Sequence, residues 1–279
     1  MTPRIREPVV AGAFYPGTED ALRAQLGALF GEGFATPRTP LRGSAGIVAP
    51  HAGYLYCGKT AAAGYRWLAA QGRPEWILVV GANHTGRGAP VSVGSAGGWR
   101  TPLALHPVAE AAGVEGAGLT VDDAAFAGEH SLEVQLPFLF HAYGDAIPWV
   151  PVCVMTRRFD RLDAAAERLA EKVGTAAVAV VASSDFTHYE PQSVAEAKDR
   201  DAIERLLAND VRGFLETVER RGLTICGAGA IALMLLVGRR LGWGSGELLS
   251  YSTSGDATGD QGSVVGYAAA GWRKADDDS

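Results

Sequence analysis

Short apolar runs alternate with amphipathic segments along most of the chain. Three runs are almost wholly apolar, as expected of strands buried on both faces of a sheet: Ala45–Ala49, Trp76–Val80 and Ala176–Ala182. Other segments show helical spacing of their apolar residues, for example Lys59–Ala70 and Asp160–Val173. This order is typical of βαβ units and predicts an α/β fold with a largely parallel or mixed central sheet flanked by helices.

The same periodicities predict the remaining elements. Helices are expected over Asp20–Phe30, Ser193–Leu207, Val211–Arg221 and Gly227–Leu241, and strands over Val91–Val93, around Trp99, and over Ile147–Met155, Leu248–Ser252 and Ser263–Ala269. Ser131–Tyr143 has a helical pattern in which Pro137 marks either a bend or the first turn. Pro148 and Pro151 favour a place near the sheet edge for their strand, because proline has no N–H to donate to a neighbour.

No segment rich in serine, proline or charge divides the chain, and no repeat of fixed period is visible. We therefore expect one domain over residues 1–272, followed by a disordered tail over residues 273–279. Tyr251–Asp260 is dense in turn-forming residues and is expected to be a loop that borders the functional site without taking part in its chemistry. A hydroxyl-rich lid over the site is the alternative.

Composition excludes several classes of protein. The 279 residues carry a net charge of -6 and contain no run rich in Lys and Arg, which argues against a general nucleic-acid binder. A run of about 18 apolar residues, as a membrane span requires, is missing, and the N-terminus does not resemble a signal peptide. Cys57, Cys153 and Cys226 are odd in number and far apart, so we expect free thiols in a cytoplasmic protein.

Three of the six histidines directly follow the three buried strands. His51, His84 and His188 come after the first, second and third of these strands, respectively. Ligands of open parallel sheets bind outside the carboxyl ends of the strands, so we expect the three side chains to converge there. Each alone would more commonly be a loop or capping residue, and only their joint placement favours a functional site.

Cys226 directly precedes the apolar helix expected over Gly227–Leu241. A thiol at a helix N-terminus lies at the positive end of the helix dipole, which predicts a lowered pKa and a thiolate. Two imidazoles and a thiolate would leave a fourth position open and suit zinc, iron or copper better than magnesium or calcium. Spacing alone, however, does not join Cys226 to the histidines, and a lone cysteine is more commonly a small buried hydrophobic residue.

His130 allows two interpretations. It stands beside Ser131 at the start of a predicted helix, where it could be purely structural. Alternatively, it points into the crevice at the strand ends and acts as an acid or base. His106 and His141 have no such context, and we expect both to be structural.

Asp185 and His188 lie three residues apart, after two serines. A Ser–His–Asp hydrolase is disfavoured because the sequence contains no G-x-S-x-G elbow. The interpretation preferred here is that Asp185 orients or neutralises a histidine of the site.

Seven motifs in this order resemble those of the Memo family, whose bacterial and archaeal members are called AmmeMemoRadiSam system protein B. In chain order the motifs are Arg6–Pro16, Pro50–Tyr54, Gly81–Gly86, Glu129–Glu133, Ser183–Tyr189, Cys226–Gly227 and Tyr251–Asp256. The resemblance covers nearly the whole chain and implies a fold like that of the class III extradiol dioxygenases (LigB-like).

The resemblance also implies roles for particular residues. The metal-binding positions are His51, His84 and Cys226, and the residues lining the same cleft as catalytic candidates are His130, Asp185 and His188. The dioxygenases carry a glutamate where this chain has a cysteine, so ring-cleaving activity is not inherited with the fold. Ala228 and Ala230 stand where relatives often carry Arg and Pro, which leaves open what that wall of the cleft binds.

Three classes of function follow. The first is a metal-dependent oxidoreductase that uses iron or copper, or else zinc, with His188 or His130 moving protons and Asp185 holding a histidine in its tautomer. The second is a non-enzymatic module that binds a metal, small molecule or peptide within a protein assembly, which the missing glutamate favours. Zinc-dependent hydrolysis is the weakest, because no glutamate base is near either ligand histidine in sequence. The resemblance implies a radical-SAM protein and AmmeMemoRadiSam protein A as partners.

Overall fold

The computed structural model describes residues 4–95, 97–109, 115–116 and 118–274. Its strands are β1 (Arg4–Arg6), β2 (Ser44–Ala49), β3 (Trp76–Ala82), β4 (Val91–Val93), β5 (Gly97–Arg100), β6 (Leu105–Val108), β7 (Thr120–Val121), β8 (Trp149–Val154), β9 (Val178–Ser183), β10 (His188–Glu190), β11 (Glu247–Thr253) and β12 (Val264–Arg273). The helices are α1 (Glu19–Phe30), α2 (Tyr54–Ala70), α3 (Leu136–Tyr143), α4 (Phe159–Val173), α5 (Gln192–Leu207), α6 (Val211–Arg220), α7 (Ala228–Arg240) and α8 (Ser254–Thr258), with short 3-10 turns at Asp123–Phe126 and Glu133–Gln135.

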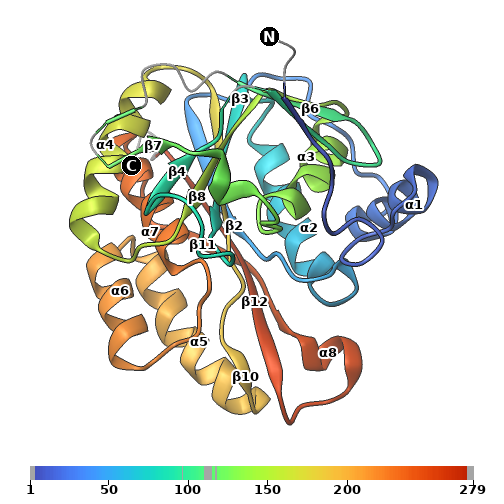
Figure 1. The fold of residues 1–279 in the computed structure, drawn as a ribbon. Helices are drawn as coiled ribbons and strands as arrows, with labels where there is room; N and C mark the ends of the chain where they lie inside the picture. Colours follow the sequence, from blue (N-terminus) through green and yellow to red (C-terminus); the bar gives the residue numbers. More distant parts are fainter. Residues whose placement is uncertain (1–3, 96, 110–114, 117, 275–279) are drawn as a thin grey trace.

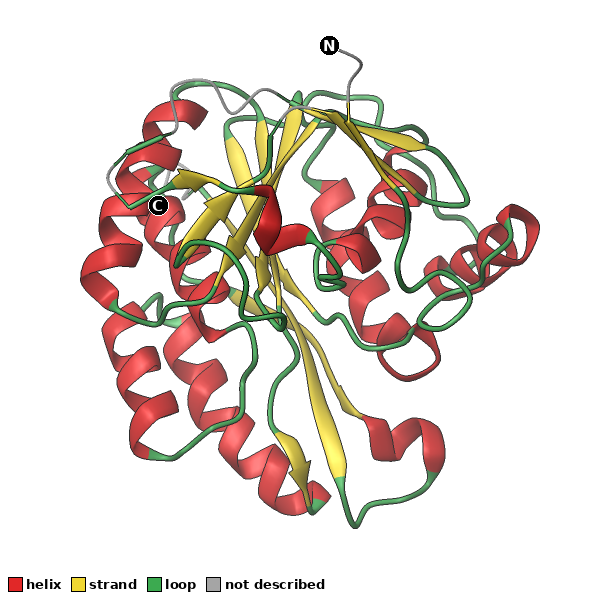
Figure 2. Cartoon of the chain, in the orientation of Figure 1, coloured by secondary structure: helices red, strands yellow, loops and turns green. Residues whose placement is uncertain are grey.

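The strands form a large mixed sheet whose main path runs β1-β5-β6-β8-β3-β9-β2-β12-β10. Its centre, β8-β3-β9-β2, is parallel, whereas β12 runs antiparallel to β2. Helices cover both faces, with α1, α2 and α3 on one side and α4 to α7 on the other (Figures 1 and 2). The expectation of an α/β fold around a mixed, mostly parallel sheet is therefore confirmed.

The central strands are buried on both faces because their side chains alternate between two cores. Ile47 of β2 packs in the core beneath α1 to α3, and its neighbour Val48 packs in the core beneath α4 to α7. In β9, Val180 and Val181 are divided in the same way. A strand that meets apolar surroundings on both sides reads as a continuous apolar run, which is why these strands are visible in the sequence.

We had expected the proline-containing strand near a sheet edge, but β8 lies inside the sheet. β8 lies between β3 on one side and the two short strands β6 and β4 on the other. β6 pairs at Trp149 and β4 pairs from Val152 onward, so Pro151 falls where one short partner gives way to the next. The missing N–H of Pro151 is tolerated there, and its carbonyl accepts the N–H of Gly94.

The C-terminal part also departs from the predictions. Ser254–Thr258 forms a short helix rather than a loop, begun by a capping box between Thr253 and Asp256. Residues 273 and 274, expected to belong to a disordered tail, are instead structured, because Arg273 ends β12 and Lys274 forms a backbone bridge with Trp243. Residues 275–279 lie outside the described part of the chain.

Among the described residues, no helix is both long enough and apolar enough to span a membrane.

Candidate metal centre

Parallel strands bring their carboxyl ends to one edge of the sheet. β2 and β3 end shortly before His51 and His84, and β9, which lies between them, ends at Ser183. Gly81 allows the Ser131–Leu132 segment to cross the end of β3, since a Cβ there would stand 2.5 Å from the Leu132 side chain. The topology thus places both imidazoles beside the loop that follows β9.

His51 is fully buried and is held at its main chain and at its ring. Its backbone N–H donates to Oδ1 of Asp185 (2.7 Å), and its Nδ1 lies 2.9 Å from Oγ of Ser183. Burial lowers the pKa of His51 well below its usual value, and the nearby His84 and His130 lower it further. The ring is therefore neutral at pH 7, the form that binds metals.

His84 is partly exposed and is held by Glu129, which is completely buried. Oε2 of Glu129 accepts the backbone N–H of His84 (2.6 Å), and Oε1 lies 2.9 Å from His84 Nδ1 and accepts the N–H of Ser131 (2.8 Å). Burial raises the pKa of Glu129, but its bonds to His84 and Ser131 outweigh that effect and set the pKa at about 2. Sequence reasoning missed this role, because it examined only His130 in the same motif.

Cys226 lies just before α7, where the sequence placed it. Its Sγ is 3.2 Å from Nε2 of His51 and accepts the backbone N–H of Asp185 (3.3 Å). The expectation of a lowered thiol pKa is wrong. Burial and the charge of Asp185 raise the pKa of Cys226 by more than its hydrogen bonds to Asp185, Ser184 and Gly227 lower it.

The three expected ligands converge. The donor atoms of His51, His84 and Cys226 all lie within 4.8 Å of one another. Two imidazole nitrogens and a sulfur at this spacing suit a single transition-metal ion, whose bonds to such atoms are roughly 2.0–2.3 Å long, after small side-chain movements. His84 and Cys226 are partly exposed, so one side of the donor set is accessible to solvent.

His130 also lies at this centre. Its ring stacks on that of His84, with 4.6 Å between ring centroids, and meets His51 edge-on at 5.4 Å. Burial and the neighbouring His84 lower its pKa, so the ring is neutral near pH 7 and can accept a proton. His84, Glu129 and His130 form a second group of donors within 4.8 Å, which shares His84 with the first.

Asp185, in the loop after β9, and His188, at the start of β10, approach the centre from the same segment. Asp185 accepts the backbone N–H groups of His51 and Ala52, and burial raises its pKa to about 6 despite these bonds. Nδ1 of His188 lies 2.9 Å from the carbonyl oxygen of Thr224, so Nδ1 carries the hydrogen and Nε2 is left free. Asp185 therefore holds the main chain of His51, while Ser183 is the partner of its ring.

The remaining histidines are away from this group. His106 is buried, and its Nε2 lies 3.0 Å from Oγ1 of Thr101. Burial lowers the pKa of His106 to about 4. His141 packs against Phe30 and Phe34, with 4.5 Å between its ring and that of Phe30. Both contacts are structural, in agreement with the expectation from the sequence.

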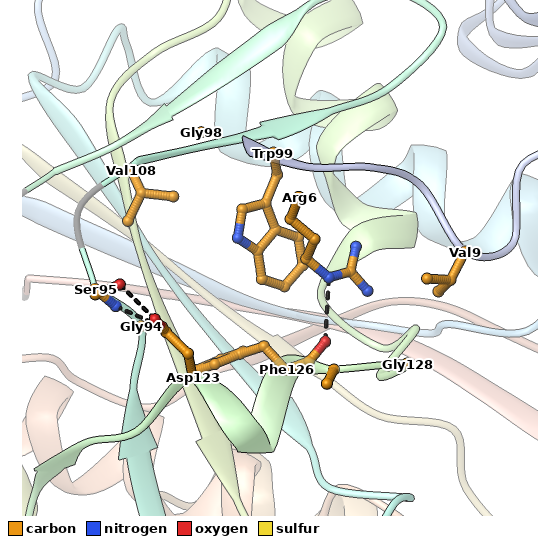
Figure 3. Close-up of a pocket in the computed structure, with 11 residues that line it drawn as sticks. Arg6, Val9, Gly94, Ser95, Gly98, Trp99, Val108, Asp123, Phe126 and Gly128 are labelled. Atoms are coloured by element: carbon orange, nitrogen blue, oxygen red, sulfur yellow. Dashed lines mark hydrogen bonds between the residues drawn. The ribbon is translucent and has the colours of Figure 1, made fainter. Parts of the chain in front are cut away.

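A separate pocket of about 250 Å³ is lined on one side by Phe126, Ala127 and Gly128, directly before Glu129 in the sequence (Figure 3). The Arg6 guanidinium covers the ring of Trp99 at 4.0 Å and donates to the carbonyl oxygens of Phe126 and Glu129. Arg6 also pairs with Glu133 at 2.7 Å. The pocket therefore shares a wall with the segment that carries Glu129 and His130, but none of the ligand side chains lines it.

Comparisons with known proteins find relatives over nearly the whole chain. The sequence profile described as "Memo-like protein" matches residues 6–271. A MEMO1 family protein of Methanopyrus kandleri is 41% identical over 96% of this chain and 99% of its own length. MEMO1 family proteins of Methanothermobacter thermautotrophicus and Nitrosopumilus maritimus are 39% and 37% identical, each over 95% of this chain and at least 98% of their own lengths.

Proposed function

Because the chain belongs to the Memo-like protein family, we propose that His51, His84 and Cys226 bind one transition-metal ion and that the cleft beside them supports redox chemistry. The observation that carries this proposal is the convergence of three donor atoms, from three distant segments, within 4.8 Å. Iron and copper suit both the donor set and redox chemistry, and zinc is the redox-inactive alternative. The ion would supply a Lewis-acid or electron-transferring centre next to the open side of the site.

The residues around the donor set have separate tasks in this proposal. His51 presents a neutral imidazole, His84 is held through its Nδ1 by Glu129, and Asp185 fixes the main chain from which His51 extends. His130, stacked on His84, is neutral near pH 7 and accepts a proton from a molecule bound at the open side. His188 has a free Nε2 and is the second candidate for moving a proton.

Metal content tests the proposal. The protein is purified without oxygen, its bound metal is measured, and the metal-free form is titrated with Fe²⁺, Cu⁺ and Zn²⁺. One ion per chain is expected. The Cys226→Ala variant should weaken binding by more than the roughly 10–100-fold that loss of an outer partner costs. Cys153→Ala, which removes a buried thiol of β8 outside the donor set, should bind like the wild type. A protein that takes up none of these metals would refute the proposal.

A non-enzymatic role is the second candidate, in which the cleft holds a metal, a small molecule or a peptide within an assembly. It is supported by Cys226, which stands where the resemblance to dioxygenases leads one to expect a glutamate. A protein that binds one metal ion per chain but consumes no oxygen in the presence of catechol-type or other reducing substrates would favour this role over redox turnover.

We also propose that the chain associates with a radical-SAM protein and with AmmeMemoRadiSam protein A. Family resemblance is the support for this proposal. Co-expression of the three proteins, followed by affinity purification through this chain, should recover all three in fixed proportion. Recovery of this chain alone, at concentrations where each partner is folded, would refute the association.

A further inference from the structure

The hydrogen-bond network behind the two histidines restricts which ring nitrogen carries the hydrogen. We infer that Ser183 and Glu129 are positioning residues that lock His51 and His84 as Nδ1–H tautomers, so that both Nε2 lone pairs face the donor set before a metal arrives. This inference deepens the proposed metal site and rests on it for its purpose. The tautomers themselves follow from counting hydrogens.

The Ser183 hydroxyl has only one hydrogen to give. It lies 2.6 Å from the carbonyl oxygen of Ser131, which can only accept a hydrogen bond, so the hydrogen points there. Nε2 of Gln135 lies 2.7 Å from the same hydroxyl and can only donate to it. Toward His51, at 2.9 Å, the Ser183 oxygen is therefore an acceptor, and Nδ1 of His51 must carry a hydrogen.

The orientation of the Gln135 amide is fixed from the other side. Its Oε1 accepts the hydroxyl hydrogen of Tyr65 at 2.7 Å, and its Nε2 also donates to the carbonyl oxygen of Pro50 at 3.0 Å. A flipped amide would set its NH₂ group against the Tyr65 hydroxyl and its oxygen against the Pro50 carbonyl. Because Gln135 and Ser183 are fully buried, water does not offer an alternative partner.

The His84 side is simpler. Both oxygens of Glu129 face N–H groups: Oε2 the backbone of His84, and Oε1 the backbone of Ser131. A carboxylate with only donors around it acts as an acceptor, so the ring nitrogen 2.9 Å from Oε1 carries its hydrogen. In the neutral ring, Nε2 then holds the lone pair.

Fixing the hydrogen on Nδ1 leaves the Nε2 lone pair available at the donor set. In His51, the free Nε2 is the atom that lies 3.2 Å from the Cys226 sulfur. In the opposite tautomer, Nε2 would carry a hydrogen pointed at the sulfur, and that hydrogen would have to move before a metal could bind. Outer partners that fix ligand tautomers in this way typically contribute about 10–100-fold to metal affinity.

Nitrogen NMR tests the inference directly on the full-length, metal-free protein. With ¹⁵N-labelled histidine, two-bond proton–nitrogen correlations distinguish a protonated Nδ1 from a protonated Nε2 in each ring. Rings 51 and 84 are assigned by comparison with His51→Gln and His84→Gln variants. Both rings are expected as Nδ1–H tautomers. An Nε2–H signal for either ring in the wild type would overturn the inference.

Two variants and two controls separate positioning from general damage. Ser183→Ala should mix the tautomers of ring 51 and weaken Co²⁺ binding by about 10–100-fold, with the thiolate-to-cobalt absorption band of Cys226 retained. Glu129→Gln should do the same for ring 84. Ser44→Ala removes another buried hydroxyl partner, that of Trp243, and Asp199→Asn alters another buried carboxylate, which accepts from Thr187 and Tyr251. Both should leave the two tautomers unchanged.

The outcomes distinguish this inference from the proposed metal site. Wild-type tautomer signals in Ser183→Ala or Glu129→Gln, together with unchanged Co²⁺ affinity, would overturn the positioning role. A wild-type protein with both expected tautomers but no metal uptake would instead refute the metal site and leave the tautomer assignment standing.

Discussion

At the scale of single residues, two completely buried carboxylates organise the surroundings of the candidate metal centre. Glu129 holds His84, and Glu133, four residues later, holds the N-terminal segment. Glu133 accepts the N–H groups of Val9 and Val10, the hydroxyl of Tyr15 and the guanidinium of Arg6. Such groups remain charged inside a protein only when they are fully partnered, so both positions are sensitive to conservative changes.

Glu133→Gln should therefore destabilise the protein strongly. The amide cannot accept all four donors and leaves the Arg6 charge, which is mostly buried, without its counter-charge. We expect a loss of about 3–5 kcal/mol in the free energy of unfolding, measured by urea denaturation. Glu7→Gln breaks the exposed Glu7–Arg100 pair instead and should cost less than about 1 kcal/mol. Equal effects of the two changes would contradict this account.

His106 makes stability depend on pH. Its pKa is about 4 when folded and about 6.5 in an unfolded chain, so between these values only the unfolded chain is protonated. Stability is unaffected above pH 6.5 and falls as the pH decreases toward 4. The contribution at pH 4.5 is about 2–3 kcal/mol. His106→Gln should lose that much less stability than the wild type between pH 7 and pH 4.5 in urea titrations, and an identical decrease would refute the assignment.

Much of the candidate metal centre could be predicted because its two histidines follow buried strands. His51 and His84 stand where parallel strands end, and that edge is common to all parallel strands of a sheet. Cys226 precedes a helix instead of following a strand, and only family resemblance connected it to the histidines. The roles of Glu129 and of Ser183 as a ring partner depend on contacts between distant segments, which no local pattern records.

At the scale of elements, local patterns were reliable where the environment on both faces is uniform. β2, β3 and β9 are buried on both sides, and their apolar runs mark them clearly. β8 was expected near an edge because its prolines suggested unpaired N–H positions. Inside the sheet, Pro151 also needs no backbone partner for an N–H, because it lies where pairing of β8 passes from the short strand β6 to the short strand β4. The start of α2 at Tyr54 was missed, because Leu55 and Tyr56 are exposed and obscure the helical pattern.

At Gly81, near the end of β3, the Ser131–Leu132 segment packs directly against the strand. An added Cβ would stand 2.5 Å from Leu132 and 2.6 Å from Oγ of Ser131, so the segment that carries Glu129 must shift. Gly81→Ala should lower stability by about 1–3 kcal/mol and weaken metal binding. Gly27→Ala in α1, where nothing lies within 4 Å, should be neutral or slightly stabilising. Thermal unfolding and a metal competition assay measure both effects, and wild-type metal binding by Gly81→Ala would contradict the argument.

At the scale of the whole molecule, the proposed ligands join parts that are far apart in the sequence. His51 and His84 follow β2 and β3 in the first third of the chain, and Cys226 precedes α7, which lies on the face of the sheet opposite α2 (Figure 1). Arg6, on β1 at one end of the strand order, is tied to the Glu129 segment as well. An ion held by all three ligands would therefore link the two helical layers.

Metal should accordingly stabilise the whole fold and not only the cleft. A ligand that binds only the folded state at 100 times its Kd adds about 2.7 kcal/mol, which for a chain of this size raises Tm by roughly 5–10 °C. Calorimetry of the metal-free protein with and without Zn²⁺ should show this rise, and Cys226→Ala should lose most of it. Cys153→Ala, whose thiol lies outside the donor set, should keep it. An equal rise in Cys226→Ala would place the bound ion elsewhere, because then the sulfur would contribute nothing to the link between the layers.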